Sequence, residues 1–238
     1  MIDTGLFIVP ARGGSKRLPG KHMIPLNGAT LIERTARCLT ESALGFPVLL
    51  TTDAPDIRSA GKALGWNAPF LRPAELASDS ASTLDTILHA LDVHETGAAT
   101  PDVTVVIQAT SPFRPAQAVA DAIRLLRQDG TLDAVVGMRR NTVPAAYHYP
   151  ETANLTALNT GLEPVLVPNG TVYAIRTEVL RRDGTLFPER LGAVITDWVG
   201  SIDIDTPDDW NIAEALAAKD LTGQVIGWAG TELPWSKA

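Results

Sequence analysis

The chain has 238 residues, of which 45% are hydrophobic and 5% aromatic, and its formal net charge is −7. This length predicts a single α/β domain over residues 1–238. The negative charge argues against a nucleic-acid-binding protein, because phosphate backbones require a basic face. Cys38 is the only cysteine, which excludes an intrachain disulfide and a cysteine-based metal cluster. No membrane association is expected, and the expected compartment is a reducing cytoplasm.

Short apolar segments alternate with segments of helical periodicity, which predicts βα units and a mostly parallel sheet. Each apolar run is bounded by turn-forming residues, as expected of buried strands. We expect strands at 6–9, 48–50, 103–107, 133–138, 172–175 and 202–204. We expect helices from residue 31, over 55–64, from residue 83, over 116–128 and from residue 207. Residues 147–168 are irregular in pattern and predict an excursion from the sheet, and the tail from residue 222 has no clear period.

Three of these helices have start signals in the sequence. Thr30 with Glu33 has the spacing of a capping box, in which each side chain accepts from the other residue's backbone N–H. Ser82 repeats the signal with an acidic residue three positions later. Thr206 precedes Pro207, and proline is favoured at the first helical position. These signals predict where the helices from residues 31, 83 and 207 begin.

The loop that follows the first expected strand, residues 10–21, is rich in glycine and cations. Glycines let backbone N–H groups approach phosphate oxygens, and lysine and arginine supply positive charge. In open α/β sheets ligands bind beyond the carboxyl ends of strands, so the loop is correctly placed for a phosphate ligand. Two other phosphate motifs are excluded: the spacing between Gly14 and Gly20 does not fit a Walker A motif, and the loop has no dinucleotide fingerprint.

Five motifs occur in order along the chain: 10–16 (PARGGSK), 71–79 (LRPAELASD), 108–112 (QATSP), 168–173 (PNGTVY) and 201–206 (SIDIDT). In this order they resemble the acylneuraminate cytidylyltransferases, or CMP-sialic acid synthetases, over about residues 7–216. The resemblance implies a Rossmann-like nucleotidyltransferase fold with a small dimerisation insertion at about 139–168, and a homodimer. It also implies transfer of CMP from CTP to an acidic acceptor, expected to be a nonulosonic (sialic-like) acid, with release of pyrophosphate.

The resemblance also implies roles for individual residues. The expected nucleotide-binding residues are Ala11, Arg12, Gly13, Gly14, Ser15, Lys16, Lys21, His22, Arg72, Ala81 and Thr83. The expected acceptor-binding residues are Gln108, Asn169 and Tyr173. The expected catalytic residues are Arg12, Lys21, Gln108 and Asp205.

Asp203 and Asp205 are the expected ligands of Mg²⁺. They are two residues apart on an expected strand, so both side chains would lie on one face and could share a metal ion. Carboxylate oxygens suit Mg²⁺, which commonly binds through one or two carboxylates together with substrate phosphates. The alternative interpretation is a polar strand end that caps the next helix.

The acceptor side departs from the sialic-acid pattern. Asn159-Thr160 stands where the family usually has an Arg-Gln pair, and no Arg or Lys occurs between Arg140 and Arg176. Arg139 or Arg140 could supply the missing charge. Three alternatives stay open: CMP transfer to a different acid, of the Kdo or phosphonate type; a non-catalytic CTP-binding protein; and a hydride-transferring Rossmann enzyme, which the missing fingerprint disfavours.

Overall fold

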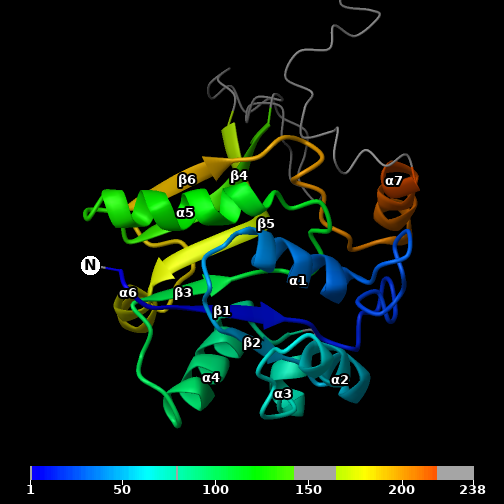
Figure 1. Ribbon diagram of the computed structural model, residues 1–238, viewed down its shortest axis with the longest axis horizontal. Helices are drawn as coiled ribbons and strands as arrows, with labels where there is room; N and C mark the ends of the chain where they lie inside the picture. Colours follow the sequence, from blue (N-terminus) through cyan, green and yellow to red (C-terminus); the bar gives the residue numbers. More distant parts are fainter. Residues whose placement is uncertain (1, 79, 142–164, 219–238) are drawn as a thin grey trace, which may run out of the picture.

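In the computed structural model, which describes residues 2–78, 80–141 and 165–218, six strands form one sheet in the order β2-β1-β3-β5-β4-β6 (Figure 1). Strands β1, β2 and β3 pair in parallel, as do β4 and β6, whereas β5 is antiparallel to both β3 and β4. This arrangement confirms the predicted mostly parallel α/β sheet. The strands are β1 (Gly5–Pro10), β2 (Val48–Thr51), β3 (Val103–Val106), β4 (Ala134–Asn141), β5 (Val165–Arg176) and β6 (Leu191–Ile195).

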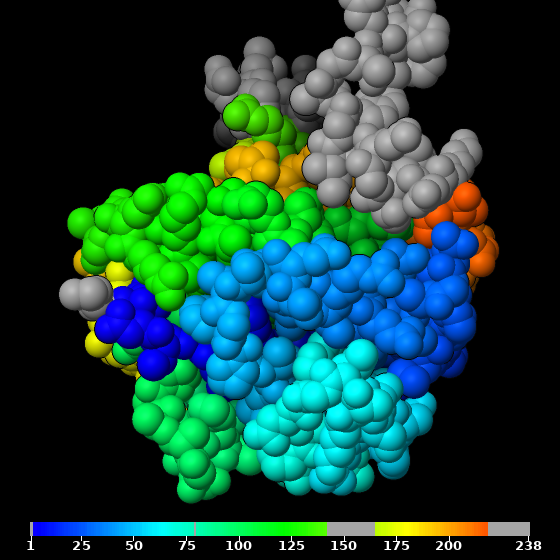
Figure 2. All heavy atoms as spheres, in the orientation of Figure 1, coloured from blue at the N-terminus to red at the C-terminus, as the bar shows by residue number. Residues whose placement is uncertain are grey.

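The sheet is covered on both faces, because successive side chains of a strand point to opposite sides. In β1, Phe7 and Val9 belong to the cluster formed with α1, α2 and α5, while Leu6 and Ile8 pack on the side of α4 and α6. Figure 2 shows atoms of α1, α2 and α5 covering the first of these faces. The helices are α1 (Leu31–Glu41), α2 (Pro55–Ala63), α3 (Ala74–Ala77), α4 (Thr83–Glu95), α5 (Ala116–Gln128), α6 (Thr177–Asp183) and α7 (Pro207–Ala218).

The predicted helix starts are confirmed by their caps. Thr30 and Glu33 form a complete capping box at α1. Ser82 accepts a hydrogen bond from the backbone N–H of Asp85 at α4. At α7, Thr206 accepts from the backbone N–H of Asp209 while the Asp209 carboxylate accepts from the backbone N–H of Thr206. No helix in the described ranges is long and apolar enough to cross a membrane.

Two predictions about strands were wrong. Residues 202–204 are not a strand, because Ile204 donates one backbone hydrogen bond to Thr110 and this segment joins no strand of the sheet. Residues 165–168, predicted as irregular, belong to β5, where Pro168 pairs with Met138 next to a register shift in the ladder. Prediction also missed the edge strand β6 and the short helices α3 and α6. The segment 142–164, most of the expected dimerisation insertion, lies outside the described residues.

Candidate active site

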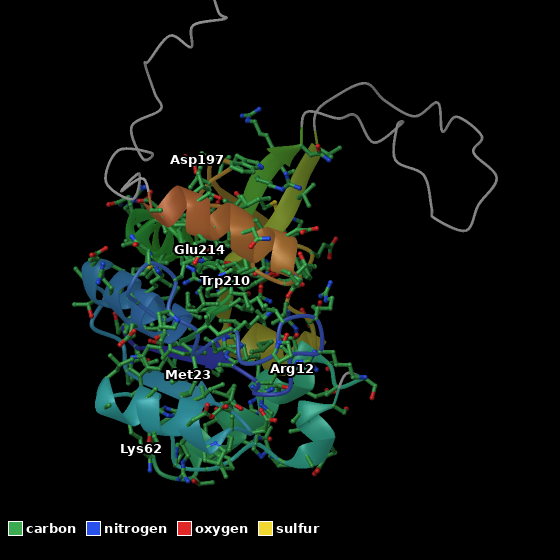
Figure 3. All side chains as sticks on the ribbon, turned by 90° about the vertical axis from the view of Figure 1, so that its right-hand side faces the viewer. Arg12, Met23, Lys62, Asp197, Trp210 and Glu214 are labelled. Carbon is green, nitrogen blue, oxygen red and sulfur yellow. The ribbon has the colours of Figure 1, made fainter. Side chains whose placement is uncertain are left out.

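The loop after β1 is held against the end of β2. The backbone N–H of Gly13 donates a 2.9 Å hydrogen bond to the Asp53 carboxylate, and that of Ala11 donates a 3.1 Å bond to the Thr51 carbonyl. A Cβ atom at position 13 would lie 2.7 Å from the Cβ of Ala54, so only glycine fits this approach. The contacts fix the loop beyond the carboxyl ends of β1 and β2, where Arg12 is seen between α7 and α4 in Figure 3.

A cavity of about 570 Å³ opens beside this loop. Its volume is in the range of about 300–1,000 Å³ that is typical of small-ligand sites. Residues from four of the five sequence motifs line this cavity. The predicted site residues that line it are Arg12, Ser15, Lys16, Lys21, His22, Arg72, Ala81, Thr83, Gln108, Asp203 and Asp205. A larger cavity, of about 800 Å³, lies between α1 and α5 and includes none of the predicted site residues.

Five of the predicted site residues do not line the cavity. Ala11, Gly13 and Gly14 form the backbone of the loop behind it. Asn169 is buried and donates hydrogen bonds of 2.6 Å to the Thr196 hydroxyl and 2.8 Å to the Ser201 hydroxyl. Tyr173 packs in the core beside α4 and α6, where burial raises the pKa of its phenol. The structure therefore does not bring Asn169 or Tyr173 to the cavity, and their acceptor-binding roles stay predictions.

Arg72 and His22 are two of the buried nitrogen-bearing side chains that line the cavity. The Arg72 guanidinium donates to the carbonyl and the hydroxyl of Thr51, and burial lowers its pKa to about 10. Burial, reinforced by the charges of Lys21 and Arg72, lowers the pKa of His22 to about 4. His22 is therefore neutral at pH 7. Its Nδ1 atom is buried without a hydrogen-bond partner in the part of the chain that the structure describes.

Asp205, which also lines the cavity, is paired with two cations of the loop. Lys21 Nζ lies 2.8 Å from Asp205 Oδ1 and 2.7 Å from the carbonyl oxygen of Ile204. Arg17 makes a 2.7 Å ion pair with the other carboxylate oxygen. Burial would raise the pKa of Asp205, but these two cations outweigh it and hold the pKa below its usual value. Asp205 is therefore ionised at neutral pH, and the sequence motifs alone did not indicate this pairing.

Asp203 differs from Asp205 although both line the cavity. Burial raises the pKa of Asp203, against a hydrogen bond from Thr110 that lowers it. Its Oδ1 atom is buried and has no hydrogen-bond partner within the described ranges. A buried carboxylate oxygen without a partner is costly unless a cation or a donor reaches it.

The donor set fits Mg²⁺ only if a substrate supplies further ligands. No group of three or more His, Cys, Asp or Glu residues that could hold a metal ion occurs in residues 2–78, 80–141 and 165–218. Two carboxylates beside a loop of cations are nevertheless the protein contribution that is usual for Mg²⁺ bound with a phosphate ligand. The Oδ1 atom of Asp203 is buried without a hydrogen-bond partner among the described residues, and such an ion would supply one.

Arg114, for which the sequence predicts no more than a bond to the neighbouring loop, holds one wall of the site in place. Its buried guanidinium donates to the carbonyl oxygens of Thr171 and Gln108. Gln108 lines the cavity, so Arg114 links that wall to β5. An arginine two residues after Pro112 in a motif of small and polar residues carries no signal of burial. This contact could be found only in three dimensions.

Comparison with known proteins identifies a family for the chain. A family model described as cytidylyltransferase matches residues 6–158. The chain is 27% identical over 222 residues to the CMP-N,N'-diacetyllegionaminic acid synthase of Legionella pneumophila, covering 89% of this chain and 95% of that protein. It is 28% identical over 224 residues to an N-acylneuraminate cytidylyltransferase of Escherichia coli, covering 90% of this chain but 52% of the relative.

A solved structure has the same fold. The structure of a CMP:2-keto-3-deoxy-manno-octonic acid synthetase complexed with CTP matches with a TM-score of 0.68 at 20% identity. The match covers 92% of this chain and 100% of the other. At this level of identity the likeness concerns the fold alone.

Proposed function

Because this chain belongs to the cytidylyltransferase family, we propose that it transfers CMP from CTP to a nonulosonic acid and releases pyrophosphate. The observation that carries the proposal is the single cavity in which the cationic loop faces the pair Asp203 and Asp205. The relatives named above act on legionaminic and neuraminic acids, by their names, and this favours an acceptor of that class. The likeness to the octonic acid synthetase supports the fold and does not select the acceptor.

In the proposed reaction the acceptor hydroxyl oxygen attacks the α-phosphorus of CTP. The new P–O bond forms as the bond to the β-phosphate oxygen breaks, pyrophosphate leaves with the electron pair, and the hydroxyl proton passes to solvent. Negative charge spreads over the phosphate oxygens, so catalysis is mainly a matter of positioning and electrostatic stabilisation. We assign the contacts with those oxygens to Arg12 and Lys16, because both line the cavity from the loop after β1.

Lys21 has a second task besides phosphate binding. An ammonium group has three donors, and two of those of Lys21 are used by Asp205 and the Ile204 carbonyl. The third remains for a phosphate oxygen. Lys21 thus holds the Asp205 carboxylate in place while it contacts the triphosphate.

Mg²⁺ is the metal that we propose for Asp203 and Asp205. When bound, it would supply positive charge to the phosphate oxygens as the P–O bond breaks. Asp205 is kept ionised by Lys21 and Arg17, as a metal ligand must be. Asp203 would contribute its buried Oδ1 atom, which has no hydrogen-bond partner among the described residues.

We also propose a homodimer in which the segment around 139–168 contributes to the contact. Only its two ends, Arg139 to Asn141 in β4 and Val165 to Pro168 in β5, belong to the described residues, and they pair as antiparallel strands. In Figure 1 these ends extend beyond the other strands of the sheet. Sedimentation at micromolar concentration should give a dimer; a fully active monomer would overturn the proposal.

The test of the reaction is a pyrophosphate-release screen with CTP, Mg²⁺ and a panel of acids. The panel contains N,N'-diacetyllegionaminic acid, N-acetylneuraminic acid, a pseudaminic acid and 3-deoxy-manno-octulosonic acid. We expect turnover with a nonulosonic acid. Turnover with the octulosonic acid alone would assign the other acceptor class. CTP binding without turnover of any acid would instead support a non-catalytic CTP-binding protein.

A further inference from the structure

A second, smaller cavity lies next to the nucleotide cavity. It has a volume of about 190 Å³, and Asp203 lines both cavities. The two spaces therefore share a wall residue, Asp203, which is one of the two carboxylates proposed to lie beside the α-phosphate of CTP. The other walls come from Arg139 of β4, from Trp198 and Ile202 in the segment before α7, and from Ile212 of α7. None of these four residues has a role in the nucleotide site.

Arg139 is the basic side chain of this cavity, and it has no partner among the described residues. The structure gives its guanidinium no hydrogen bond or ion pair with another described residue, although it is half-buried. The two other polar side chains of the walls beside Asp203 are engaged. Asp209 accepts from the backbone N–H groups of Asp205 and Thr206, and the Ser201 hydroxyl bonds to the Asp197 carbonyl. An anionic ligand in this cavity would give the Arg139 guanidinium a partner.

Arg140 does not share this position. Successive side chains of a strand point to opposite faces, so Arg140 lies on the other side of β4 from Arg139. It is exposed and is not among the residues of the cavity. The strand therefore separates two adjacent arginines into one that faces the cavity and one that faces solvent.

The apolar walls add a second requirement for the ligand. The Trp198 side chain is 58% exposed and that of Ile212 45% exposed, although both belong to a cavity wall. An exposed indole ring packs well on the C–H face of a sugar ring, because both surfaces are flat and apolar. A ligand that carries a carboxylate and a sugar ring would satisfy both Arg139 and Trp198.

We propose that this cavity binds the sugar-acid acceptor, with Arg139 contacting its carboxylate and Trp198 packing on its ring. The inference rests on the proposed function, since it places the acceptor for that reaction. In a nonulosonic acid the carboxylate is attached to the carbon that bears the reacting hydroxyl. A carboxylate held at Arg139 therefore keeps the hydroxyl near Asp203, at the junction with the nucleotide cavity.

The test compares Arg139→Ala with Arg140→Ala, a matched control one residue along the same strand. Steady-state pyrophosphate release is measured for both variants with the best acid of the panel, together with the Kd of CTP by calorimetry. We expect Arg139→Ala to raise the acceptor KM about 10- to 100-fold, as the loss of one charge-assisted hydrogen bond predicts. The Kd of CTP should stay within about twofold of the original value. Arg140→Ala should leave both constants near those of the original protein, and Arg139→Lys should recover part of the loss.

A second experiment changes the acceptor instead of the protein. An acceptor whose carboxylate is converted to an amide should have a raised KM with the original protein, and Arg139→Ala should add little further loss. Equal and independent losses from the two changes would overturn the assignment of Arg139, as would an unchanged acceptor KM in Arg139→Ala. If Trp198→Ala shifts the protein to monomers and leaves the acceptor KM unchanged, Trp198 is an interface residue and its assignment is overturned. Failure of the proposed function looks different, because the original protein would then release no pyrophosphate with any acid.

Discussion

Lys21 Nζ lies 2.8 Å from Asp205 Oδ1, and this contact joins two residues that are 184 positions apart. It connects the loop after β1 to the segment before α7, so the two halves of the site are linked before any ligand binds. The link holds the carboxylate ionised and aimed at the cavity.

Asp205→Asn should abolish turnover while the protein stays folded. The amide keeps the shape of the side chain but removes a metal ligand, and transition-state stabilisation should fall by several kcal/mol, a loss of about three orders of magnitude or more. Pyrophosphate release at saturating Mg²⁺ measures the loss, and circular dichroism checks the fold. Asp208→Asn is the matched control, because Asp208 is exposed in the first turn of α7. Near-normal activity of Asp205→Asn would remove the metal assignment.

The cavity should prefer CTP to the other three nucleoside triphosphates. Arg72, Ala81 and Thr83 line the cavity together with His22, and we expect them to contact the base and ribose. Calorimetry with CTP, UTP, ATP and GTP should give the lowest Kd for CTP. An ATP affinity equal to that of CTP would contradict the proposed specificity.

Gly13→Ala should destabilise the protein, whereas Gly14→Ala should not. The new methyl group at position 13 would approach Ala54 to 2.7 Å, while a methyl at position 14 would meet nothing within 4 Å. Overpacking of this kind typically costs about 1–3 kcal/mol of the free energy of unfolding. Urea unfolding of the two variants measures the difference. Equal free energies of unfolding would contradict this prediction. They would show that the loop moves to accommodate a methyl group at position 13 and that the hydrogen bond to Asp53 does not hold it in place.

The free energy of unfolding should depend on His22 in mildly acid solution. The pKa of His22 is lowered to about 4 in the folded protein, below its usual value of 6.5. The unfolded chain therefore binds the proton first as pH falls, and the folded state loses stability from about pH 6.5 downward. Between pH 7 and pH 5 the loss should be about 2 kcal/mol.

This pH dependence can be isolated with His22→Asn. The other titrating groups are common to both proteins, so the difference between the two urea-unfolding curves reports on position 22. Without ligand, the original protein should lose about 2 kcal/mol more than the variant between pH 7 and pH 5. Parallel pH profiles would mean that His22 takes up its proton in the folded protein as readily as in the unfolded chain.

Much of the nucleotide half could be predicted from the sequence, because its signals are local. The capping box at Thr30 and the proline after Thr206 are short-range patterns with a direct structural meaning. The loop after β1 could be placed because strand ends in α/β sheets define one edge. Eleven of the predicted site residues accordingly line one cavity.

The errors arose where the determining contacts are distant in sequence. Residues 202–204 have the alternation of a strand, but no neighbouring strand is available and Ile204 bonds to Thr110 instead. β6 is an edge strand whose side chains are only partly buried, so its apolar signal is weak. The hydrogen bonds of Asn169 are equally distant in sequence, because its amide donates to Thr196 and Ser201, which follow it by 27 and 32 positions. Its acceptor-binding role stays a prediction. No local pattern contains these partnerships.

The reversed direction of β5 has a consequence for how the enzyme could be re-engineered. Because β4 is antiparallel to β5 and parallel to β6, Asn141 and Val165 are paired at the same edge of the sheet, beyond the strand ends that carry the phosphate loop. The polypeptide between them can thus be replaced as a cassette whose two attachment points are already adjacent. Such an exchange would leave every hydrogen bond of β1, β2 and β3 in place. A chimera that takes residues 142–164 from a relative should therefore keep its affinity for CTP, because every described residue that lines the nucleotide cavity lies outside the exchanged segment.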